Sequence, residues 1–453
     1  MNKDNKNHKE RPLPPINDDL TIGVLGLGYV GLPLAVEFSK IKNFSVIGFD
    51  SKEERINELN SGFDCTGTLK KSDMEEIKNQ LIFTEKKNKL IKCNVFIVCV
   101  PTPVDEFKIP NLKALISATS TIAEILSSKK TSYIQDHASV VIYESTVFPG
   151  VTEDICSKII EKKINSSLGE AFVLGYSPER VNPGISSQQE LTNIKKITSG
   201  SDKKTREWVD ALYSLIIKSG TFSAASIKIA EAAKIVENIQ RDINIALVNE
   251  LSLLFNSMNI DTNDVIDAAS TKWNFIPFRP GLVGGHCIGV DPYYLSYIAE
   301  KYQIHTELIK SGRRINDNMA GWLARKIAKH YYKQSEKIKS KNVLILGACF
   351  KENCPDVRNS QSIHLTKIMQ SYGFQVDVVD ELAFKYGNKL VDEIKINPYP
   401  KSKVGYGIIV CAVAHKTYFD LTIEDWINLK NNQYSILFDV KNVIPRELNP
   451  LRL

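Results

Sequence analysis

The feature that most constrains the fold is a glycine-rich turn near the amino end of the chain. Residues Gly26-Leu27-Gly28-Tyr29-Val30-Gly31 follow the apolar stretch 21–25 and open a segment of helical character. Glycines between a strand and a helix permit a tight turn, close approach of the backbone to a pyrophosphate, and close helix–strand packing. The first N–H groups of that helix are unpaired and attract phosphate. This spacing predicts a parallel α/β sheet whose first turn binds a dinucleotide.

An acidic residue narrows the choice of dinucleotide. Asp50 ends the next predicted strand, 19 residues after Gly31. A carboxylate at this place accepts hydrogen bonds from both hydroxyls of an adenosine ribose and disfavours a 2′-phosphate. The pattern therefore favours NAD over NADP. The alternative is a glycine turn without a ligand, and the combination of strand, helix and Asp50 argues against it.

Apolar segments alternate with helical segments in two separate regions, which is the pattern of parallel sheets covered by helices. The predicted strands are residues 22–25, 45–49, 95–100, 139–143 and 172–175, and then 342–347, 375–380 and 407–413. Between them, residues 221–276 contain no Gly and no Pro, and apolar residues recur there at helical spacing. That region predicts one long helix of ~30 residues, spanning about 226–258, and then a shorter one.

The fold class that follows is α/β, with two Rossmann-like, doubly wound domains joined by a central helical domain. The predicted parts are a flexible polar arm at 1–19, an NAD-binding domain at 20–222, a central helical domain at 223–325 and a second Rossmann-like domain at 326–453. A helix as long and apolar as 226–258 must be covered on most sides, so we expect it to join two domains or to pack against a second subunit.

Composition excludes several classes of protein. With 43% hydrophobic and 24% charged residues among 453, the chain is not wholly disordered. The net charge of +6 is not gathered into a basic tract, so we expect no nucleic-acid partner. No apolar run approaches the ~20 residues of a membrane span. The polar first residues are unlike a signal peptide, and the eight Cys at irregular spacings indicate free thiols, so we expect a cytoplasmic enzyme.

The segment 280–291 presents a cysteine among glycines. Cys287 follows Gly281, Gly284 and Gly285, and Asp291 lies four residues further on. A cysteine in a dehydrogenase can hold an aldehyde as a thiohemiacetal, whose oxidation gives a thioester that water opens to an acid. The alternative is a buried cysteine that acts only as a small hydrophobic side chain. The residues alone leave these two interpretations open.

Two polar residues lie on the predicted long helix. Lys234 and Asn238 are four apart and therefore share one helical face. A lysine there can stabilise an oxyanion or hold a catalytic water. From spacing alone, a solvated face or an intrahelical pair with Glu231 or Glu237 is favoured.

Other cysteine and histidine positions give no metal site. His286 adjoins Cys287, but the chain has no HExxH and no paired CxxC, and adjacent side chains point apart. Cys349 and Cys354 lack a partner pair and are expected to be free thiols. The turn 347–351 can hold a nucleotide, although it lacks the dinucleotide pattern.

Together these residues give the chain a resemblance to a known family. From about residue 21 to the carboxyl end, it resembles the nucleotide-sugar 6-dehydrogenases of the UDP-glucose/UDP-N-acetylhexosamine dehydrogenase family. The matching motifs are GLGYVGLPLA from Gly26, VPTP from Val100, EST from Glu144, SPERVNPG from Ser177, AEAAKIVEN from Ala230, GGHCIGVD from Gly284 and FKENCPDVR from Phe350. The PERVNPG and GGHCIGVDPYYL forms are most similar to the UDP-N-acetylglucosamine 6-dehydrogenases of surface-polysaccharide synthesis, which serve capsule, Vi-antigen or O-antigen.

The resemblance implies a four-electron oxidation of the sugar C6 alcohol to a carboxylate with two NAD⁺. Catalytic roles fall on Cys287 as nucleophile, Lys234 and Asp291 for the oxyanion and water, Asn238 beside them, Thr146 near the nicotinamide, and Glu179. Implied NAD contacts are Gly26, Leu27, Gly28, Tyr29, Val30, Gly31, Asp50, Arg55, Thr102, Ser145, Thr146 and Arg358. Implied UDP-sugar contacts are Glu179, Arg180, Lys234, Asn238, Arg279, Gly284, Phe350 and Lys351. The resemblance also implies that the Rossmann-like domain 326–453 binds UDP, and that the long helix forms the contact of a homodimer or larger homo-oligomer.

The chain departs from the UDP-glucose pattern in one position. UDP-glucose members carry a second glutamate four residues after the one matching Glu179, and Pro183 stands there in this chain. If that carboxylate serves thioester hydrolysis, its role must pass to Glu179, Arg180 or water. The loop 272–281 also differs from the UDP-glucose form, which leaves a cross-subunit role of Arg279 open.

Two other functions compete with this one. A two-electron NAD dehydrogenase would need neither Cys287 nor a third α/β domain, and would form one NADH per substrate instead of two. A non-catalytic nucleotide-sensing homologue would have lost turnover, against which the intact Cys287, Lys234 and Asp291 argue. Within the family chemistry, UDP-GalNAc, UDP-ManNAc and UDP-glucose remain alternative substrates.

Overall fold

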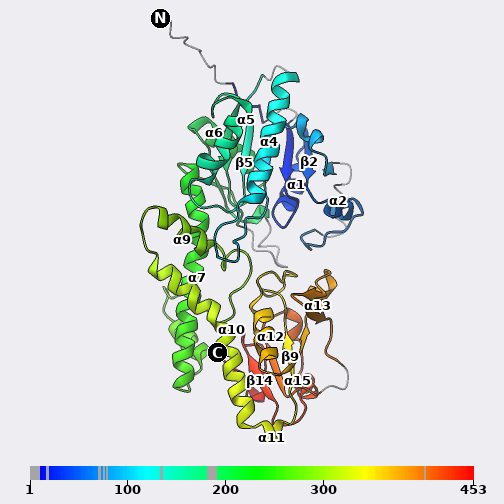
Figure 1. Cartoon of the computed structure of the whole chain (residues 1–453), viewed down its shortest axis with the longest axis vertical. Coiled ribbons are helices and arrows are strands. Elements are labelled where there is room, and N and C mark those ends of the chain that lie inside the picture. The colour runs from blue at the N-terminus through cyan, green and yellow to red at the C-terminus, as the bar shows by residue number, and fades with distance from the viewer. Residues whose placement is uncertain are drawn as a thin grey trace, which may run out of the picture. The chain divides into compact units, whose positions relative to one another are not determined.

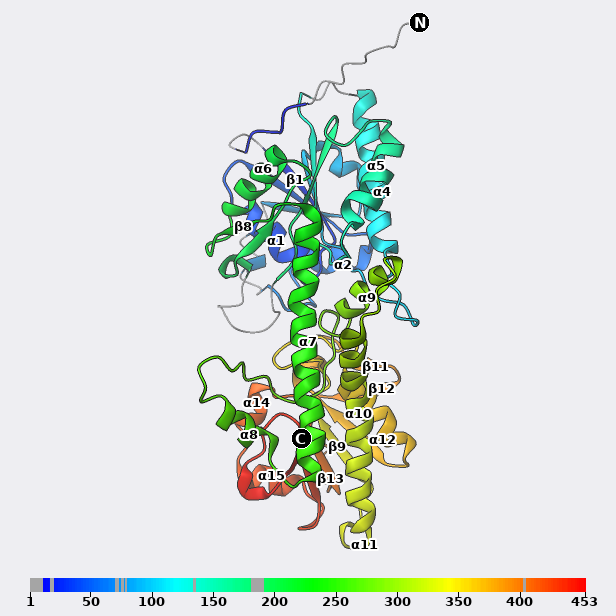
Figure 2. The same ribbon diagram turned by 90° about the vertical axis from the view of Figure 1, so that its left-hand side faces the viewer.

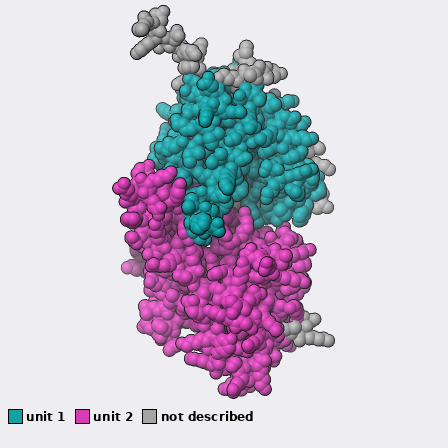
Figure 3. Space-filling view, in the orientation of Figure 1, with its two compact units in different colours: residues 1–236 teal, residues 237–453 magenta. Residues whose placement is uncertain are grey.

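The computed structural model describes residues 11–16, 20–69, 73–74, 77, 80–132, 136–180, 191–401 and 405–453. Much of the predicted arm 1–19 therefore lies outside the described residues. The chain divides into two compact units, Met1–Val236 and Glu237–Leu453 (Figure 3). All eight cysteines are free thiols, as expected. Within the described part of the chain, no helix combines the length and apolarity needed to cross a membrane.

Unit 1 is built on a six-stranded parallel sheet in the order β3-β2-β1-β4-β5-β6. The strands are β1 Leu20–Leu25, β2 Phe44–Phe49, β3 Leu81–Thr84, β4 Val95–Val98, β5 Ser139–Tyr143 and β6 Phe172–Tyr176. Central strands such as β4 and β5 are buried throughout, because helices cover both faces of a parallel sheet. The order in which the strands are added reverses between β1 and β4. In such folds ligands bind outside the carboxyl ends of the strands at this switch point.

Helices cover the two faces of this sheet. They are α1 Gly31–Ser39, α2 Glu53–Asn60, α4 Lys113–Ser132, α5 Ser157–Ile164 and α6 Lys203–Ser214. α1 and α6 share one face, where the rings of Phe38 and Tyr213 are 5.7 Å apart, and α4 and α5 cover the other (Figures 1 and 2). A small parallel pair, β7 Lys196–Thr198 and β8 Thr221–Ser223, follows the main sheet.

The predicted long helix is confirmed as α7, Ile227–Ser257, with 31 residues (Figure 2). The shorter helix after it is α8, Thr262–Ala269, which Asp261 caps by accepting a hydrogen bond from the amide of Asn263. α7 belongs to unit 1 up to Val236 and to unit 2 from Glu237 onward.

Unit 2 repeats the sheet pattern. Its seven strands run in the order β11-β12-β10-β9-β13-β14-β15, all parallel except that β11 pairs antiparallel with β12. They are β9 Asn342–Leu346, β10 Gln375–Val379, β11 Leu390–Val391, β12 Ile394–Asn397, β13 Ile408–Cys411, β14 Ile436–Asp439 and β15 Leu451–Arg452. The central order β12-β10-β9-β13-β14 matches β3-β2-β1-β4-β5 of unit 1. The prediction of two Rossmann-like sheets with a helical region and one long helix is confirmed.

The helices of unit 2 are α9 Asp291–Lys301, α10 Glu307–Lys333, α11 Ser335–Ile338, α12 Gln361–Ser371, α13 Glu381–Lys385, α14 Lys416–Phe419 and α15 Ile423–Leu429. α10, with 27 residues, is a second long helix that the sequence analysis did not predict. It runs beside the second half of α7 (Figure 2), to which buried polar side chains join it, among them Arg313 to Asp242 and Asn316 to Asn249.

Candidate active site

In unit 1 the three glycines of the first turn do three different things. Gly26 has a φ of +94°, and its amide donates to the carbonyl of Phe49 over 2.8 Å, which makes the tight turn. A Cβ on Gly31 would lie 1.9 Å from the carbonyl oxygen of Gly26, so α1 can approach the turn only with glycine there. A Cβ on Gly28 would meet nothing within 4 Å. The turn therefore combines tight packing behind it with open space in front, which fits a pyrophosphate.

Asp50 follows β2 and faces this turn. Its carboxylate accepts hydrogen bonds from the amides of Leu27 and Lys52, each over 3.0 Å, and the side chain is partly exposed. Arg55 lies behind the turn: its Nε donates to the carbonyl of Leu27 over 2.9 Å, and its guanidinium pairs with Asp64 over 2.7 Å. Arg55 is buried and holds the backbone of the turn.

The other predicted NAD contacts of unit 1 lie at the same edge of the sheet. Thr102 donates its hydroxyl to the carbonyl of Thr146 over 2.6 Å, which joins the segments after β4 and β5. Ser145 donates to the carbonyl of Val100 over 2.7 Å. These segments follow β4, which pairs with β1, and β5, which pairs with β4 in the same parallel sheet. The structure therefore brings these residues to the carboxyl edge that carries the glycine turn.

Behind this edge lies a buried charge cluster that sequence reasoning missed. Glu144, in the EST motif, accepts hydrogen bonds from Lys196 over 2.6 Å and from the Tyr213 hydroxyl over 2.5 Å. Burial raises the pKa of Glu144, although Lys196 counteracts it. Glu179 also acts on Lys196: burial would lower the pKa of this lysine, but Glu144 and Glu179 outweigh burial and raise it. The motif was the available signal, but it names no partner for Glu144.

Glu179 and Arg180 end the described stretch after β6. The Arg180 guanidinium donates to the carbonyl of Lys195 over 3.0 Å. Pro183, which replaces the second glutamate of UDP-glucose members, lies outside the described residues.

In unit 2, Cys287 lies on a turn that leads directly into α9. Its carbonyl accepts hydrogen bonds from the amides of Val290 over 3.0 Å and Asp291 over 2.9 Å. The Cys287 side chain is partly exposed, unlike a cysteine that only fills a core. Asp291 begins α9, and its carboxylate accepts a hydrogen bond from Asn238 of α7 over 2.5 Å. The turn therefore places the carboxylate, its amide partner and the thiol-bearing backbone together.

The two glycines before Cys287 let this segment pack on the turn after β9. A Cβ on Gly284 would lie 2.5 Å from the carbonyl oxygen of Asn359, and one on Gly285 would lie 2.6 Å from the ring of Phe350. Gly285 also has a φ of +84° and accepts a hydrogen bond from Asn359 Nδ2 over 3.3 Å. Burial lowers the pKa of the neighbouring Lys351, while the charge of Cys287 acts in the opposite direction.

Two arginines predicted to contact ligands, Arg358 and Arg279, form ion pairs with aspartates of the chain. Arg358 donates to Asp356 over 2.5 Å and lies 3.4 Å from His286 Nδ1. Arg279 donates to the carbonyl of Asn263 over 3.1 Å and forms an ion pair with Asp267 of α8.

The solvated-face interpretation of α7 is wrong. Lys234 is 7% exposed and Asn238 5% exposed, so both are buried in a largely apolar helix. Glu231 is also buried, and its carboxylate accepts hydrogen bonds from the amides of Gly150 over 2.6 Å and Thr152 over 3.0 Å. Burial raises the pKa of Glu231 to about 7. The sequence showed helical spacing but could not show that packing covers this face.

One group in the described part of the chain has the spacing of a metal site: Cys349, Asp380 and His415. Both ring nitrogens of its histidine already have hydrogen-bond partners. His415 Nδ1 accepts the amide of Asn353 over 3.0 Å, and Nε2 lies 3.0 Å from Asp380 Oδ2, to which it donates. A ring whose one acceptor nitrogen is occupied offers no lone pair to a metal. The group is a hydrogen-bonded support for the turn after β9.

Comparisons with known proteins agree with this geometry. Three models of the UDP-glucose/GDP-mannose dehydrogenase family match the chain: the NAD binding domain over residues 20–217, the central domain over 228–318 and the UDP binding domain over 344–446.

Similar proteins extend over nearly the whole chain. A UDP-N-acetyl-D-glucosamine 6-dehydrogenase of Salmonella typhi is 43% identical over 96% of this chain and 99% of its own. One of Pseudomonas aeruginosa is 45% identical over 96% of this chain and 100% of its own. The solved structure of a UDP-D-ManNAc dehydrogenase from Pyrococcus horikoshii has a TM-score of 0.80 at 28% identity, covering 94% of this chain and 96% of that one. The chain belongs to the UDP-glucose/GDP-mannose dehydrogenase family.

Proposed function

We propose that this protein oxidises the C6 hydroxyl of UDP-N-acetylglucosamine to a carboxylate with two NAD⁺, through a covalent intermediate on Cys287. The observation that carries the proposal is the partly exposed Cys287 on a turn that also positions Asp291 against Asn238. Relatives with 43–45% identity that are named for this sugar support the choice of substrate.

The residues of the first turn fit NAD. The open space in front of Gly28 and the partly exposed carboxylate of Asp50 suit a pyrophosphate and an adenosine ribose, respectively. When bound, NAD⁺ accepts the hydride in each of the two oxidations. Thr102, Ser145 and Thr146 would line the same edge. Arg55 would act by holding the carbonyl of Leu27, since its guanidinium is buried against Asp64.

The residues of the chain would carry the rest of the chemistry. The C6 alcohol loses a proton and a hydride to become an aldehyde, and the Cys287 thiolate adds to that carbon to give a thiohemiacetal. Loss of its hydroxyl proton and of a second hydride converts the thiohemiacetal to a thioester. Water then adds to the thioester carbon, the C–S bond breaks, and the thiolate leaves as the acid forms.

Supporting roles fall to buried polar groups. Lys234 would stabilise the oxyanion in both tetrahedral species, since an ammonium in a buried setting acts more strongly than in water. Asp291, held by Asn238, would orient the water and take its proton. Glu179 would assist hydrolysis in place of the glutamate that Pro183 replaces.

The UDP-sugar would be held chiefly by the UDP-binding domain. Gly284 packs on Phe350, which lies with Lys351 in the turn after β9. Burial lowers the pKa of Lys351, but its Nζ still lies over the Phe350 ring, where a cation is favoured. Arg180 and Arg279 would add further contacts, and Arg358 would serve NAD.

The proposed assembly is a homodimer or larger homo-oligomer through α7. Ile229, Val236, Leu247 and Leu254 of α7 are each more than half exposed, at intervals of 7, 11 and 7 residues. At 100° per residue these positions fall on one stripe of the helix. An exposed apolar stripe of this kind favours contact with a second copy. Light scattering of the purified protein measures the assembly, and Leu247→Asp with Leu254→Asp should shift it to monomer.

The test is the number of NADH molecules formed per UDP-N-acetylglucosamine consumed. Two NADH and a uronic acid are expected, with Cys287→Ala forming no acid and Cys287→Ser retaining at most a slow first oxidation. UDP-GalNAc, UDP-ManNAc and UDP-glucose are run alongside, and two NADH from one of these instead would move the substrate but keep the mechanism. One NADH with an aldehyde product, or full turnover by Cys287→Ala, would refute the covalent mechanism.

A further inference from the structure

A buried polar network in unit 2 ends on the backbone that carries Cys287. Asn249 of α7 is fully buried and pairs with both backbone groups of Gly281: its Oδ1 accepts the amide over 2.8 Å, and its Nδ2 donates to the carbonyl over 3.0 Å. Gly281 lies six residues before Cys287. A two-point pair to the backbone of one residue fixes both the position and the orientation of that residue.

The network continues from Asn249 into α10. Asn249 Nδ2 also donates to Asn316 Oδ1 over 2.8 Å, and Asn316 Nδ2 donates to Asp242 Oδ1 over 2.8 Å. Asp242 in turn accepts from Arg313 over 2.5 Å. All of these side chains are buried, so each would leave costly unpaired partners if it were removed.

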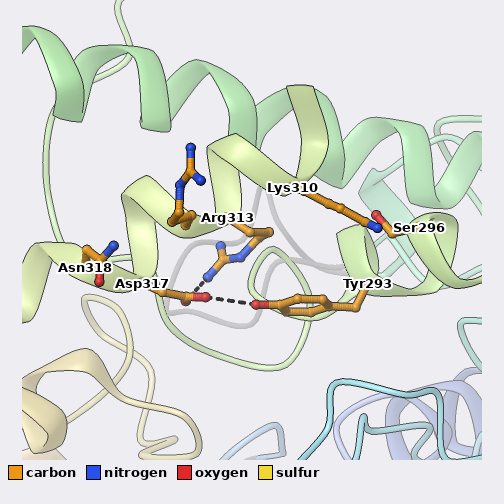
Figure 4. Close-up of a pocket in the computed structure, with 7 residues that line it drawn as sticks. Tyr293, Ser296, Lys310, Arg313, Asp317 and Asn318 are labelled. Atoms are coloured by element: carbon orange, nitrogen blue, oxygen red, sulfur yellow. Dashed lines mark hydrogen bonds and ion pairs between the residues drawn. The ribbon is translucent and has the colours of Figure 1, made fainter. Parts of the chain in front are cut away.

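The far end of the network reaches the other side of the Cys287 segment. Arg313 forms an ion pair with Asp317, which also accepts a hydrogen bond from the Tyr293 hydroxyl over 2.8 Å (Figure 4). Tyr293 lies in the first turn of α9, six residues after Cys287. One continuous chain of hydrogen bonds therefore anchors the nucleophile segment six residues before and six residues after the thiol.

We propose that Asn249 and Tyr293 are positioning residues, which fix the segment 281–293 so that the Cys287 thiol is held at the reacting carbon. The proposal rests on the proposed function for the identity of the nucleophile. The Asn249–Gly281 pair fixes the backbone at the start of the segment, and the Tyr293–Asp317 hydrogen bond fixes its end, where α9 begins. Asp291, four residues after Cys287, is carried along by the same anchoring.

The first test is Asn249→Ala. A displacement of about 1 Å at a reacting group lowers rate by about 100-fold, so kcat is expected to fall by that order. The KM for UDP-N-acetylglucosamine should change less than about three-fold, because in the described part of the chain the Asn249 side chain bonds to Gly281 and Asn316, neither of which is assigned to substrate. Amide hydrogen exchange in peptides covering 281–290 should quicken by at least about ten-fold, since the Gly281 amide loses its acceptor.

Asn256→Ala is the matched control. Asn256 lies two turns further along α7, and its side chain donates to the carbonyls of Ser252 over 3.1 Å and Arg452 over 3.4 Å, away from the nucleophile segment. This variant loses comparable hydrogen bonds on the same helix, but its kcat and its exchange in 281–290 should match the wild type. Equal losses of kcat in the two variants would reduce Asn249 to a general structural role and overturn the proposal.

Tyr293→Phe keeps the proposal testable if Asn249→Ala does not fold. The Tyr293 side chain is partly exposed and borders a cavity of about 310 Å³, so loss of one hydroxyl is tolerated there. We expect kcat to fall about five-fold with KM unchanged, the effect of one lost hydrogen bond. Unchanged kcat and unchanged exchange in 281–290 would refute the proposal. If the wild-type protein forms no uronic acid, the proposed function fails, while hydrogen exchange still decides whether the network anchors the segment.

Discussion

The two units contain the same backbone turn, built with different side chains. In unit 1, Gly26 has a φ of +94° and its amide donates to the last residue of β2; in unit 2, Gly347 has a φ of +96° and its amide donates to the last residue of β10. In each unit an aspartate follows that strand and accepts the amide of the residue after the glycine: Asp50 from Leu27, and Asp380 from Ala348.

The aspartates differ in what else they bind. Asp50 is partly exposed and can accept hydroxyls from a ligand, whereas Asp380 is fully buried. Asp380 accepts the amides of Ala348, Cys349 and Ala383 and a ring N–H of His415. Burial would raise the pKa of Asp380, but these bonds lower it to about 2. The same turn therefore offers its acid to a ligand in unit 1 and uses it to hold the fold in unit 2.

Replacing the turn glycines by alanine should have the largest effects, which are on ligand binding. Gly31→Ala places a Cβ 1.9 Å from the Gly26 carbonyl oxygen, and Gly347→Ala places one 2.4 Å from the Cβ of Val413 at a positive φ. Each change should abolish the binding of one ligand and leave the binding of the other unchanged. Gly31→Ala should lose NAD binding, and Gly347→Ala should lose UDP binding. Calorimetric titration with NAD⁺ and with UDP measures both. Loss of UDP binding in Gly31→Ala, with the variant still folded, would contradict the assignment of NAD to the first turn and UDP to the second.

The next effect is on stability, at the buried aspartate. Asp380→Asn leaves several buried donors without a charged acceptor, and we expect a loss of about 3–5 kcal/mol in the free energy of unfolding. Because the pKa of Asp380 is lowered to about 2, its charge contributes stability above about pH 4 that is lost as the pH falls toward 2. Denaturant unfolding of wild type and variant from pH 2.5 to 7 checks this. A difference that stayed constant below pH 4 would contradict it.

The turn chemistry was predictable from sequence to the extent that it is local. Gly26, Asp50 and the apolar strands between them are short-range signals, and they predicted both the sheet and its ligand. Strand β3 was missed because it has only four residues and Ile82 is 59% exposed, so it lacks the fully apolar run of a central strand. The burial of Asp380 was hidden for another reason: it depends on His415, 35 residues away.

The candidate site divides in the same way. Cys287 and Asp291 lie in one segment whose glycines indicate an irregular, closely packed backbone. The structure places both residues on one turn. The polar partners of that segment are distant in sequence, since Asn249 lies 32 residues from Gly281 and Asp242 lies 71 residues from Arg313. No local pattern distinguishes these residues from ordinary helix surface, and only helix packing shows that they are buried.

A carboxyl of unit 1 should give the opposite pH signature to Asp380. Burial raises the pKa of Glu231 from about 4.5 to about 7, so the folded state binds its proton more tightly than the unfolded chain. Stability from this group is full below pH 4.5 and is lost as the pH rises to about 7, by at most about 3 kcal/mol. In Glu231→Gln this slope should vanish. A wild-type-minus-variant difference that did not vary between pH 4.5 and 7 would show that Glu231 stays charged in the fold.

The smallest expected effect, and the most direct comparison of the two turns, is at Asp50. Asp50→Asn removes the charge that accepts the ribose hydroxyls, and one or two charge-assisted hydrogen bonds correspond to a KM for NAD⁺ raised about ten-fold. The free energy of unfolding should change by less than about 1 kcal/mol, because Asp50 is partly exposed and accepts only the amides of Leu27 and Lys52 in the described part of the chain. Discrimination against NADP⁺ should also weaken, since the carboxylate no longer repels a 2′-phosphate. The two variants should therefore affect different properties: Asp50→Asn lowers cofactor binding, and Asp380→Asn lowers stability. If Asp50→Asn destabilised the protein as much as Asp380→Asn, both aspartates would be structural, and the NAD specificity would have to come from another residue of the first turn.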